Sequence, residues 1–298
     1  MTDKLDEFIP QRVLIVGYGD IGRRVARLCK ENDIAVSGLA RSPESAAGMQ
    51  NDEVSVITAD LDRPETLVGL QVAGSLVIYL APPPRSGTTD PRMGHFLASL
   101  EAGPQPEKIL YLSTSGVYGN RDGGTVTEET LPKPGVDRAR RRLDAEQQLG
   151  KFCDENRIDY VILRVGGIYG PGRLPVKRIQ DGIPIIHEQL APKTNRIHAD
   201  DLATICLAAA RFGKTGKVYN VSDGCESNMT EYFFAVADHL GLPRPPTVDW
   251  DEAEKVISPG MLSYLRESRR MDNSRMINDL HVKLRYPDLK TGLQDIDK

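Results

Sequence analysis

Three glycines, Gly17, Gly19 and Gly22, have the spacing that a phosphate-binding loop requires. They stand between a short β-branched run and a helical stretch at residues 23–30, a setting that favours this function over an ordinary turn. Gly17 would permit the tight turn, Gly19 would let a pyrophosphate approach the backbone, and Gly22 would let helix and strand pack closely. The free N–H groups and positive dipole end of the helix would then hold the phosphates. The predicted contact residues are Gly17, Tyr18, Gly19, Asp20, Ile21 and Gly22.

The end of the second strand pattern distinguishes between NAD and NADP. An NAD-binding protein places Asp or Glu about 20 residues after the glycines, against the ribose 2′-hydroxyl. Ala40 stands there instead, followed by Arg41 and Ser42. A guanidinium suits a 2′-phosphate through bidentate hydrogen bonds, so NADP is expected over NAD, although Arg41 also fits a solvated surface position. Asp60 could contact the adenine or cap the next turn. The remaining predicted cofactor contacts are Leu61, Leu80, Ala81 and Pro82.

The elements that must position these residues follow the pattern of βαβ units. Short runs that are apolar at nearly every position alternate with amphipathic stretches of helical length, which indicates a parallel sheet covered on both faces. The runs lie at residues 13–16, 34–39, 54–57, 76–80, 109–112 and 160–163. We therefore predict an α/β fold: a doubly wound parallel Rossmann sheet with a smaller, mostly helical C-terminal substrate lobe.

Domain boundaries are expected where this rhythm changes. After Arg164 comes a Gly/Pro-rich segment, then a helical stretch at 200–211 and one short strand at 218–221. These features place an NADP-binding domain at 11–170, with a returning segment at 197–222, and the substrate lobe at 171–196 and 223–298. Residues 261–271 are expected to form a partly covered surface helix or the outer wall of a cleft.

Composition excludes several function classes. The 298 residues carry 38 basic and 42 acidic side chains, a net charge of −4 that gives no general attraction for nucleic acid or an anionic membrane. The first ten residues contain no apolar signal segment, and no apolar run is long enough for a membrane span, so a soluble, cytoplasmic protein is expected. The four cysteines are scattered without metal-ligand spacing, which predicts reduced structural thiols and no metal site.

Five further segments complete the pattern: LSTSGVYG at 112–119, EETLP at 128–132, LRVGGIYGPG at 163–172, RIHADDL at 196–202 and YNVSD at 219–223. In their order and spacing they resemble the extended or atypical short-chain dehydrogenase/reductases, also called the NAD-dependent epimerase/dehydratase superfamily. The resemblance covers nearly the whole chain. It implies that Thr114 hydrogen-bonds the substrate oxygen at which hydride chemistry occurs, although Thr114 and its serine neighbours could instead satisfy backbone groups at the strand end.

The resemblance also exposes a departure in the catalytic pair. Family members carry a Tyr and a Lys at positions i and i+4 of a helix, where both side chains share one face. Here Arg138 and Arg142 stand at those positions. Arg142 could still bridge the nicotinamide ribose, but an arginine stays protonated near neutral pH and Arg138 cannot shuttle a proton. Tyr118, Tyr169 or water would have to replace the missing phenol.

Two functions are consistent with these motifs. The first is an NADP-dependent oxidoreductase or epimerase-like enzyme that transfers hydride at a hydroxyl or carbonyl carbon of a small, anionic substrate. The second is a non-catalytic NADP(H)-binding sensor or regulatory protein, which the missing pair favours. Substrate contacts are predicted at Ser115, Tyr169 and Arg196, and the family resemblance suggests a homodimer.

Overall fold

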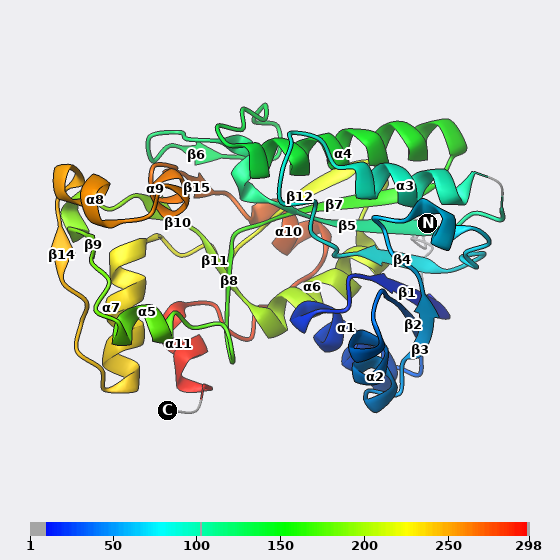
Figure 1. The fold of residues 1–298 in the computed structure, drawn as a ribbon, viewed down its shortest axis with the longest axis horizontal. Helices are drawn as coiled ribbons and strands as arrows, with labels where there is room; N and C mark the ends of the chain where they lie inside the picture. The colour runs from blue at the N-terminus through cyan, green and yellow to red at the C-terminus, as the bar shows by residue number, and fades with distance from the viewer. Residues whose placement is uncertain (1–9, 102, 297–298) are drawn as a thin grey trace, which may run out of the picture.

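A seven-stranded, wholly parallel sheet forms the centre of the computed structural model, which describes residues 10–101 and 103–296. The N-terminal segment interpreted above lies almost entirely outside these residues. The strand order is β12-β7-β5-β4-β1-β2-β3 (Figure 1). The strands are β1 (Arg12–Val16), β2 (Ala35–Ala40), β3 (Ser55–Thr58), β4 (Leu76–Tyr79), β5 (Lys108–Thr114), β7 (Asp159–Val165) and β12 (Lys217–Val221).

Helices cover both faces of this sheet, as the continuous apolar strands require. On one face, α1 (Asp20–Glu31) and α6 (Ala199–Phe212) bury Val25 and Leu202 in one core layer. On the other face, α3 (Pro91–Leu100) and α4 (Asp137–Asn156) bury Phe96 and Leu149 in a second layer. Figure 1 shows these two helix pairs on opposite sides of the strands, with α2 (Pro43–Asn51) near the β3 edge.

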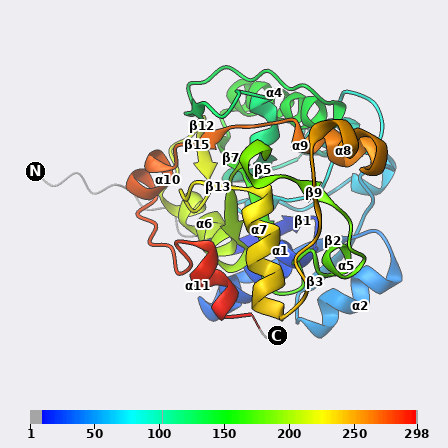
Figure 2. The same ribbon diagram turned by 90° about the vertical axis from the view of Figure 1, so that its left-hand side faces the viewer.

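Outside the central sheet lie short helices and two-stranded pairs, most of them in the predicted substrate lobe around α7. Figure 2 shows α7 at the front of the lobe, with α5 and α11 on either side. The helices are α5 (Val176–Gln180), α7 (Met229–Leu240), α8 (Trp250–Val256), α9 (Pro259–Leu265), α10 (Ser274–Asp279) and α11 (Leu289–Gln294). The strand pairs are β8 (Gly167–Tyr169) with β11 (Arg196–His198), β9 (Ile185–Ile186) with β14 (Thr247–Val248), β10 (Lys193–Thr194) with β13 (Ser227–Asn228), and β6 (Thr125–Val126) with β15 (Arg270–Met271). Three 3₁₀ turns complete the elements: η1 (Pro64–Leu67), η2 (Ser115–Tyr118) and η3 (Glu188–Leu190).

The predicted fold class is confirmed, and each of the seven predicted strands is present with ends shifted by two residues at most. The helix predicted at 261–271 is wrong in its second half, because α9 ends at Leu265. Beyond it the backbone pairs with a distant segment: the Arg270 N–H donates to Gly124 O at 3.0 Å, and β15 runs beside β6. Helical spacing within 261–271 carries no information about that distant partner.

Three of the four cysteines, Cys29, Cys153 and Cys206, are buried, and Cys225 is exposed, all as free thiols. Burial raises the pKa of each of the three buried thiols to about 12. Within residues 10–101 and 103–296, no His, Cys, Asp and Glu side chains gather into a group that could hold a metal ion. Over the same residues, no helix combines the length and apolarity needed to cross a membrane.

Candidate functional site

The loop between β1 and α1 has the geometry predicted for a phosphate cradle. Gly17 has a φ of +103°, and a Cβ there would lie 2.5 Å from the Ala81 nitrogen. Gly19 is the N-cap of α1 without a side-chain hydrogen bond, and a Cβ there would meet nothing within 4 Å. Gly22 packs closely against the loop and the strand, since its Cβ would lie 2.9 Å from Gly17 O and 3.2 Å from Ile15 Cγ2 of β1. The first turn of α1 therefore faces open space without a capping side chain.

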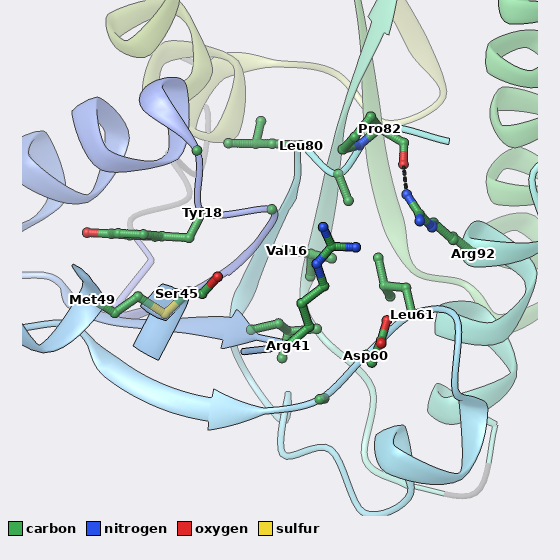
Figure 3. A pocket seen from close by; sticks show the side chains of 15 residues that line it. Val16, Tyr18, Arg41, Ser45, Met49, Asp60, Leu61, Leu80, Pro82 and Arg92 are labelled. Atoms are coloured by element: carbon green, nitrogen blue, oxygen red, sulfur yellow. Dashed lines mark hydrogen bonds between the residues drawn. The ribbon is translucent and has the colours of Figure 1, made fainter. Parts of the chain in front are cut away.

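A cavity of about 280 Å³ lies over this loop, at the carboxyl ends of the strands (Figure 3). Asp60 has the turn role, since its Oδ1 accepts the Asp62 N–H at 3.0 Å, and it also lines the cavity, so its contact with the adenine stays a prediction. The predicted residues that line the cavity are Gly17, Tyr18, Gly19, Arg41, Asp60, Leu61, Leu80, Ala81 and Pro82.

Of the four predicted cofactor contacts that do not line the cavity, Gly22 is the packing glycine described above, and the side chains of the other three are engaged elsewhere. The Asp20 carboxylate binds Arg24 and Arg173, which links α1 to the loop after β8. Ile21 is 5% exposed and belongs to the core beneath the sheet. The Ser42 hydroxyl accepts the Ser45 N–H at 3.3 Å as the N-cap of α2. These three side chains therefore support the fold around the cavity and do not line it.

Six lining residues were missed in the sequence: the apolar Val16, Leu39, Met49 and Ala59, and the polar Ser45 and Arg92. Ser45 lies in the first turn of the helix that Ser42 caps, so it could have been considered beside it. Arg92 comes from α3 and binds Asp62 through two hydrogen bonds of 2.7 and 2.6 Å, while also donating to Pro82 O at 2.9 Å. No local motif marks Arg92, because only the packing of α3 beside the β4 end brings it there.

Arg41 differs from Arg92 in having no bound carboxylate. Figure 3 shows its guanidinium extending into the cavity, and no Asp or Glu among the described residues forms an ion pair with it. The Arg92 hydrogen bonds hold the pKa of Asp62 below its usual range, so that carboxylate stays ionised beside Arg92. Arg41 is therefore available to an anion entering the cavity.

Arg142 reaches the strand ends beside the cavity. Its Nη1 donates to Leu112 O at 3.0 Å, to the Tyr111 hydroxyl at 3.2 Å and to Ala81 O at 3.3 Å. One helical turn further along, Glu146 forms a buried ion pair with Arg164 on β7 at 2.7 Å, which holds α4 against the sheet. The position of Arg142 is thus determined by packing and three acceptors at the ends of β4 and β5.

Thr114 ends β5 and is half-buried. Its hydroxyl oxygen accepts the Gly116 N–H at 3.2 Å, as the backbone interpretation predicted. This bond uses the oxygen as acceptor and leaves the hydroxyl proton free for another group. A role in holding a substrate oxygen is therefore compatible with the backbone role.

Three other predicted residues have side chains that face away from the cavity over the glycine loop. Tyr118 is fully buried and its hydroxyl donates to Asn220 at 2.7 Å, so it does not face the cleft as a proton source. Ser115 is 7% exposed and lies against Arg269. Arg138 is exposed and turns away from the cofactor cavity toward the substrate lobe.

A second cavity, of about 180 Å³, lies between the Gly166–Pro175 region and the substrate lobe. Tyr169 and Arg196 both line it, as do Arg173 and Tyr264, and no acidic residue does. The Arg196 guanidinium is 5% exposed, stacks 4.2 Å from the Tyr232 ring centroid and donates to Ser227 at 2.6 Å. The Tyr169 hydroxyl donates to Asp288 O at 3.2 Å, which excludes it as a free acid.

Known proteins match this chain over most of its length. A family model described as "NAD dependent epimerase/dehydratase family" matches residues 13–222. Protein YeeZ of Escherichia coli K12 is 25% identical over 293 residues, covering 93% of this chain and 97% of YeeZ. The dTDP-6-deoxy-L-talose 4-dehydrogenase (NAD(P)(+)) of Kitasatospora kifunensis is 22% identical, covering 88% and 94%.

Two matches concern proteins without a described function. The uncharacterized protein y4nG of Sinorhizobium fredii is 32% identical over 156 residues, so the match spans 47% of this chain and only 39% of y4nG. Among solved structures, a functionally unknown conserved protein from Silicibacter pomeroyi DSS superimposes with a TM-score of 0.79 at 29% identity, covering 95% of this chain and 97% of that one.

Proposed function

Since the chain belongs to the NAD-dependent epimerase/dehydratase family, we propose that it is an enzyme that transfers hydride between NADP and a hydroxyl or carbonyl carbon of a small anionic substrate. The observation that carries this proposal is the position of Arg142. Its guanidinium lies at the ends of β4 and β5, where it donates to the carbonyl of the cavity-lining Ala81 and to that of Leu112, two residues before Thr114. Arg142 would hold the ribose in either function, but a charge beside the strand end that carries Thr114 would in addition stabilise a substrate oxygen, which a protein that only binds the dinucleotide does not require.

The residues present fit a dinucleotide. The open first turn of α1 and the space above Gly19 would receive the pyrophosphate, and Arg41 would bind the 2′-phosphate. Bound NADP or NADPH would accept or supply the hydride. Arg142 would then hold the ribose next to the reacting centre and stabilise negative charge on the substrate oxygen.

The substrate end supports a small anionic compound. The cavity of about 180 Å³ is lined by Arg173 and Arg196 and by no carboxylate. Arg173 is already paired with Asp20, whereas Arg196 forms no ion pair with a described carboxylate. Arg196 would therefore attract a carboxylate or phosphate, with Tyr169 and Tyr232 as apolar walls beside it. Thr114 would donate its hydroxyl proton to the oxygen of the reacting carbon.

The test has two steps on the purified wild-type chain. Calorimetric titration with NADPH and NADH measures cofactor affinity, and a panel of short keto acids, hydroxy acids and sugar nucleotides is then screened at the nicotinamide absorbance band. We expect tighter binding of NADPH and a substrate-dependent absorbance change. Tight NADPH binding without turnover on any compound would favour the NADP(H) sensor, and binding of neither nucleotide would refute both.

A further inference from the structure

The tyrosines of this chain differ sharply in accessibility. All ten lie within the described residues, and eight of them are buried; only Tyr18 and Tyr264 are half-buried. The Tyr18 hydroxyl is occupied, because it donates to Asp52 at 3.0 Å. Tyr264 is therefore the one accessible phenol whose hydroxyl makes no hydrogen bond to a described residue.

Tyr264 belongs to α9 but reaches the strand ends of the Rossmann sheet. It lines the cavity of about 180 Å³, and its hydroxyl lies 3.7 Å from the position that a Cβ of Gly167 would occupy. Gly167 follows β7, whose Val165 pairs in register with Thr114 on β5. Neighbouring strands lie about 4.8 Å apart, so the phenol lies just beyond the end of the strand next to the one that carries Thr114.

Arg138 links Tyr264 to α4, the helix in which Arg138 itself stands at the position of the family's tyrosine. Its Nη1 donates to the Ser263 hydroxyl at 2.9 Å, and its guanidinium carbon lies 5.8 Å from the Tyr264 ring centroid. The residue at the position of the usual helix tyrosine thus contacts a tyrosine of the substrate lobe. Such cation–π contact orients a ring at an exposed site.

We propose that Tyr264 is the general acid and base of the reaction and that Arg138 is its positioning residue. This inference rests on the proposed function. In the reducing direction, bound NADPH would supply the hydride that forms a C–H bond at the carbonyl carbon and would leave as NADP⁺. As the C=O π electrons move to oxygen, that oxygen would take the Tyr264 phenol proton, giving an alcohol and a phenolate that solvent reprotonates; oxidation would follow the same steps in reverse.

The alternatives within the site are unsuitable. The hydroxyls of Tyr118 and Tyr169 donate to Asn220 and to a backbone carbonyl respectively. Glu267, which is 8% exposed, is committed to an ion pair with Arg269 at 3.0 Å. Tyr264 combines an ionisable group, an open hydroxyl and a place at the strand ends.

The kinetic test compares Tyr264→Phe with the matched control Tyr160→Phe, which makes the same change at the far end of β7. For whichever panel substrate the wild type turns over, we expect Tyr264→Phe to lower kcat roughly 100- to 10,000-fold, the usual contribution of general acid catalysis. Its NADPH affinity by calorimetry should match wild type, and Tyr160→Phe should keep full activity. Arg138→Ala should lower kcat at unchanged NADPH affinity, with partial rescue in Arg138→Lys.

A second measurement needs no turnover. Tetranitromethane nitrates accessible phenols, and mass spectrometry of the wild-type chain should find Tyr264 modified, with saturating NADP⁺ lowering that modification several-fold. Equal nitration with and without bound NADP⁺, or full kcat in Tyr264→Phe, would overturn the assignment of Tyr264. Failure of the wild type on every panel compound would instead overturn the proposed function, and the acid/base role with it.

Discussion

Replacing Arg41 by alanine should selectively weaken the binding of NADP. Arg41 extends into the cofactor cavity and is not neutralised by a carboxylate, while Ala40 leaves the NAD-type position empty of charge. A bidentate contact with the 2′-phosphate comprises two hydrogen bonds between charged groups, each worth about 1.5–3 kcal/mol. Because Arg41 is exposed, the lower value applies to each bond, giving a loss of about 3 kcal/mol, or roughly 150-fold in Kd.

The assay is calorimetric titration of NADPH and NADH into wild type and Arg41→Ala at one fixed ionic strength, because salt screens exposed charges. NADPH affinity should fall by that factor while NADH affinity stays unchanged. Arg63→Ala, an exposed arginine paired with Glu65, serves as the control and should change neither affinity. An equal loss for both nucleotides, or none, would refute the assignment of Arg41 to the 2′-phosphate.

Four further substitutions test the glycine loop, the role of Arg142 and the buried carboxyl of Asp223. Gly17→Ala should destabilise the fold by roughly 1–3 kcal/mol from backbone strain alone. Gly19→Ala should unfold at the same temperature as wild type but should lose NADPH affinity, because its added side chain occupies the space for the pyrophosphate. Equal thermal stability of the two variants would contradict this difference. Arg142→Ala should weaken NADPH binding about 10- to 100-fold in calorimetry, from the loss of charged hydrogen bonds, and an unchanged Kd would remove Arg142 from the ribose. Burial raises the pKa of Asp223 to about 6, because the folded state disfavours the charged carboxylate. The free energy of unfolding therefore falls as the pH rises from the unfolded pKa of this group through about 6. Asp223→Asn should therefore add about 1–2 kcal/mol in urea unfolding at about pH 8 and nothing near pH 4, and a gain independent of pH would show that charge is not the cause.

Local sequence was sufficient to predict the glycine loop and the strands of the central sheet. The roles of Gly17, Gly19 and Gly22 follow from steric limits that act within one strand, turn and helix, so their spacing predicts their function. The strand positions follow from apolar runs because a strand covered on both faces excludes polar residues throughout its length. The missing carboxylate at Ala40 and the substitution by Arg138 and Arg142 are likewise readable as residue identities.

Tertiary structure determined which side chains face the site. Ser42 and Asp20 were plausible contacts by position, but a free N–H of α2 and two arginines compete for their oxygens. Tyr118 matched a family motif, yet its hydroxyl is bound to Asn220, about one hundred residues away in the chain. Such competition depends on partners that come together only when the chain folds.

The same reason explains Arg92 and Tyr264. Neither belongs to a local motif: Arg92 reaches the cofactor cavity because α3 packs beside the β4 end, and Tyr264 reaches the strand edge because the substrate lobe returns over it. Sequence alone determined the fold class, the phosphate cradle and the absence of the usual Tyr and Lys. Only long-range packing decided which arginine remains available to an anion and which phenol remains open, because both depend on contacts between segments far apart in the chain.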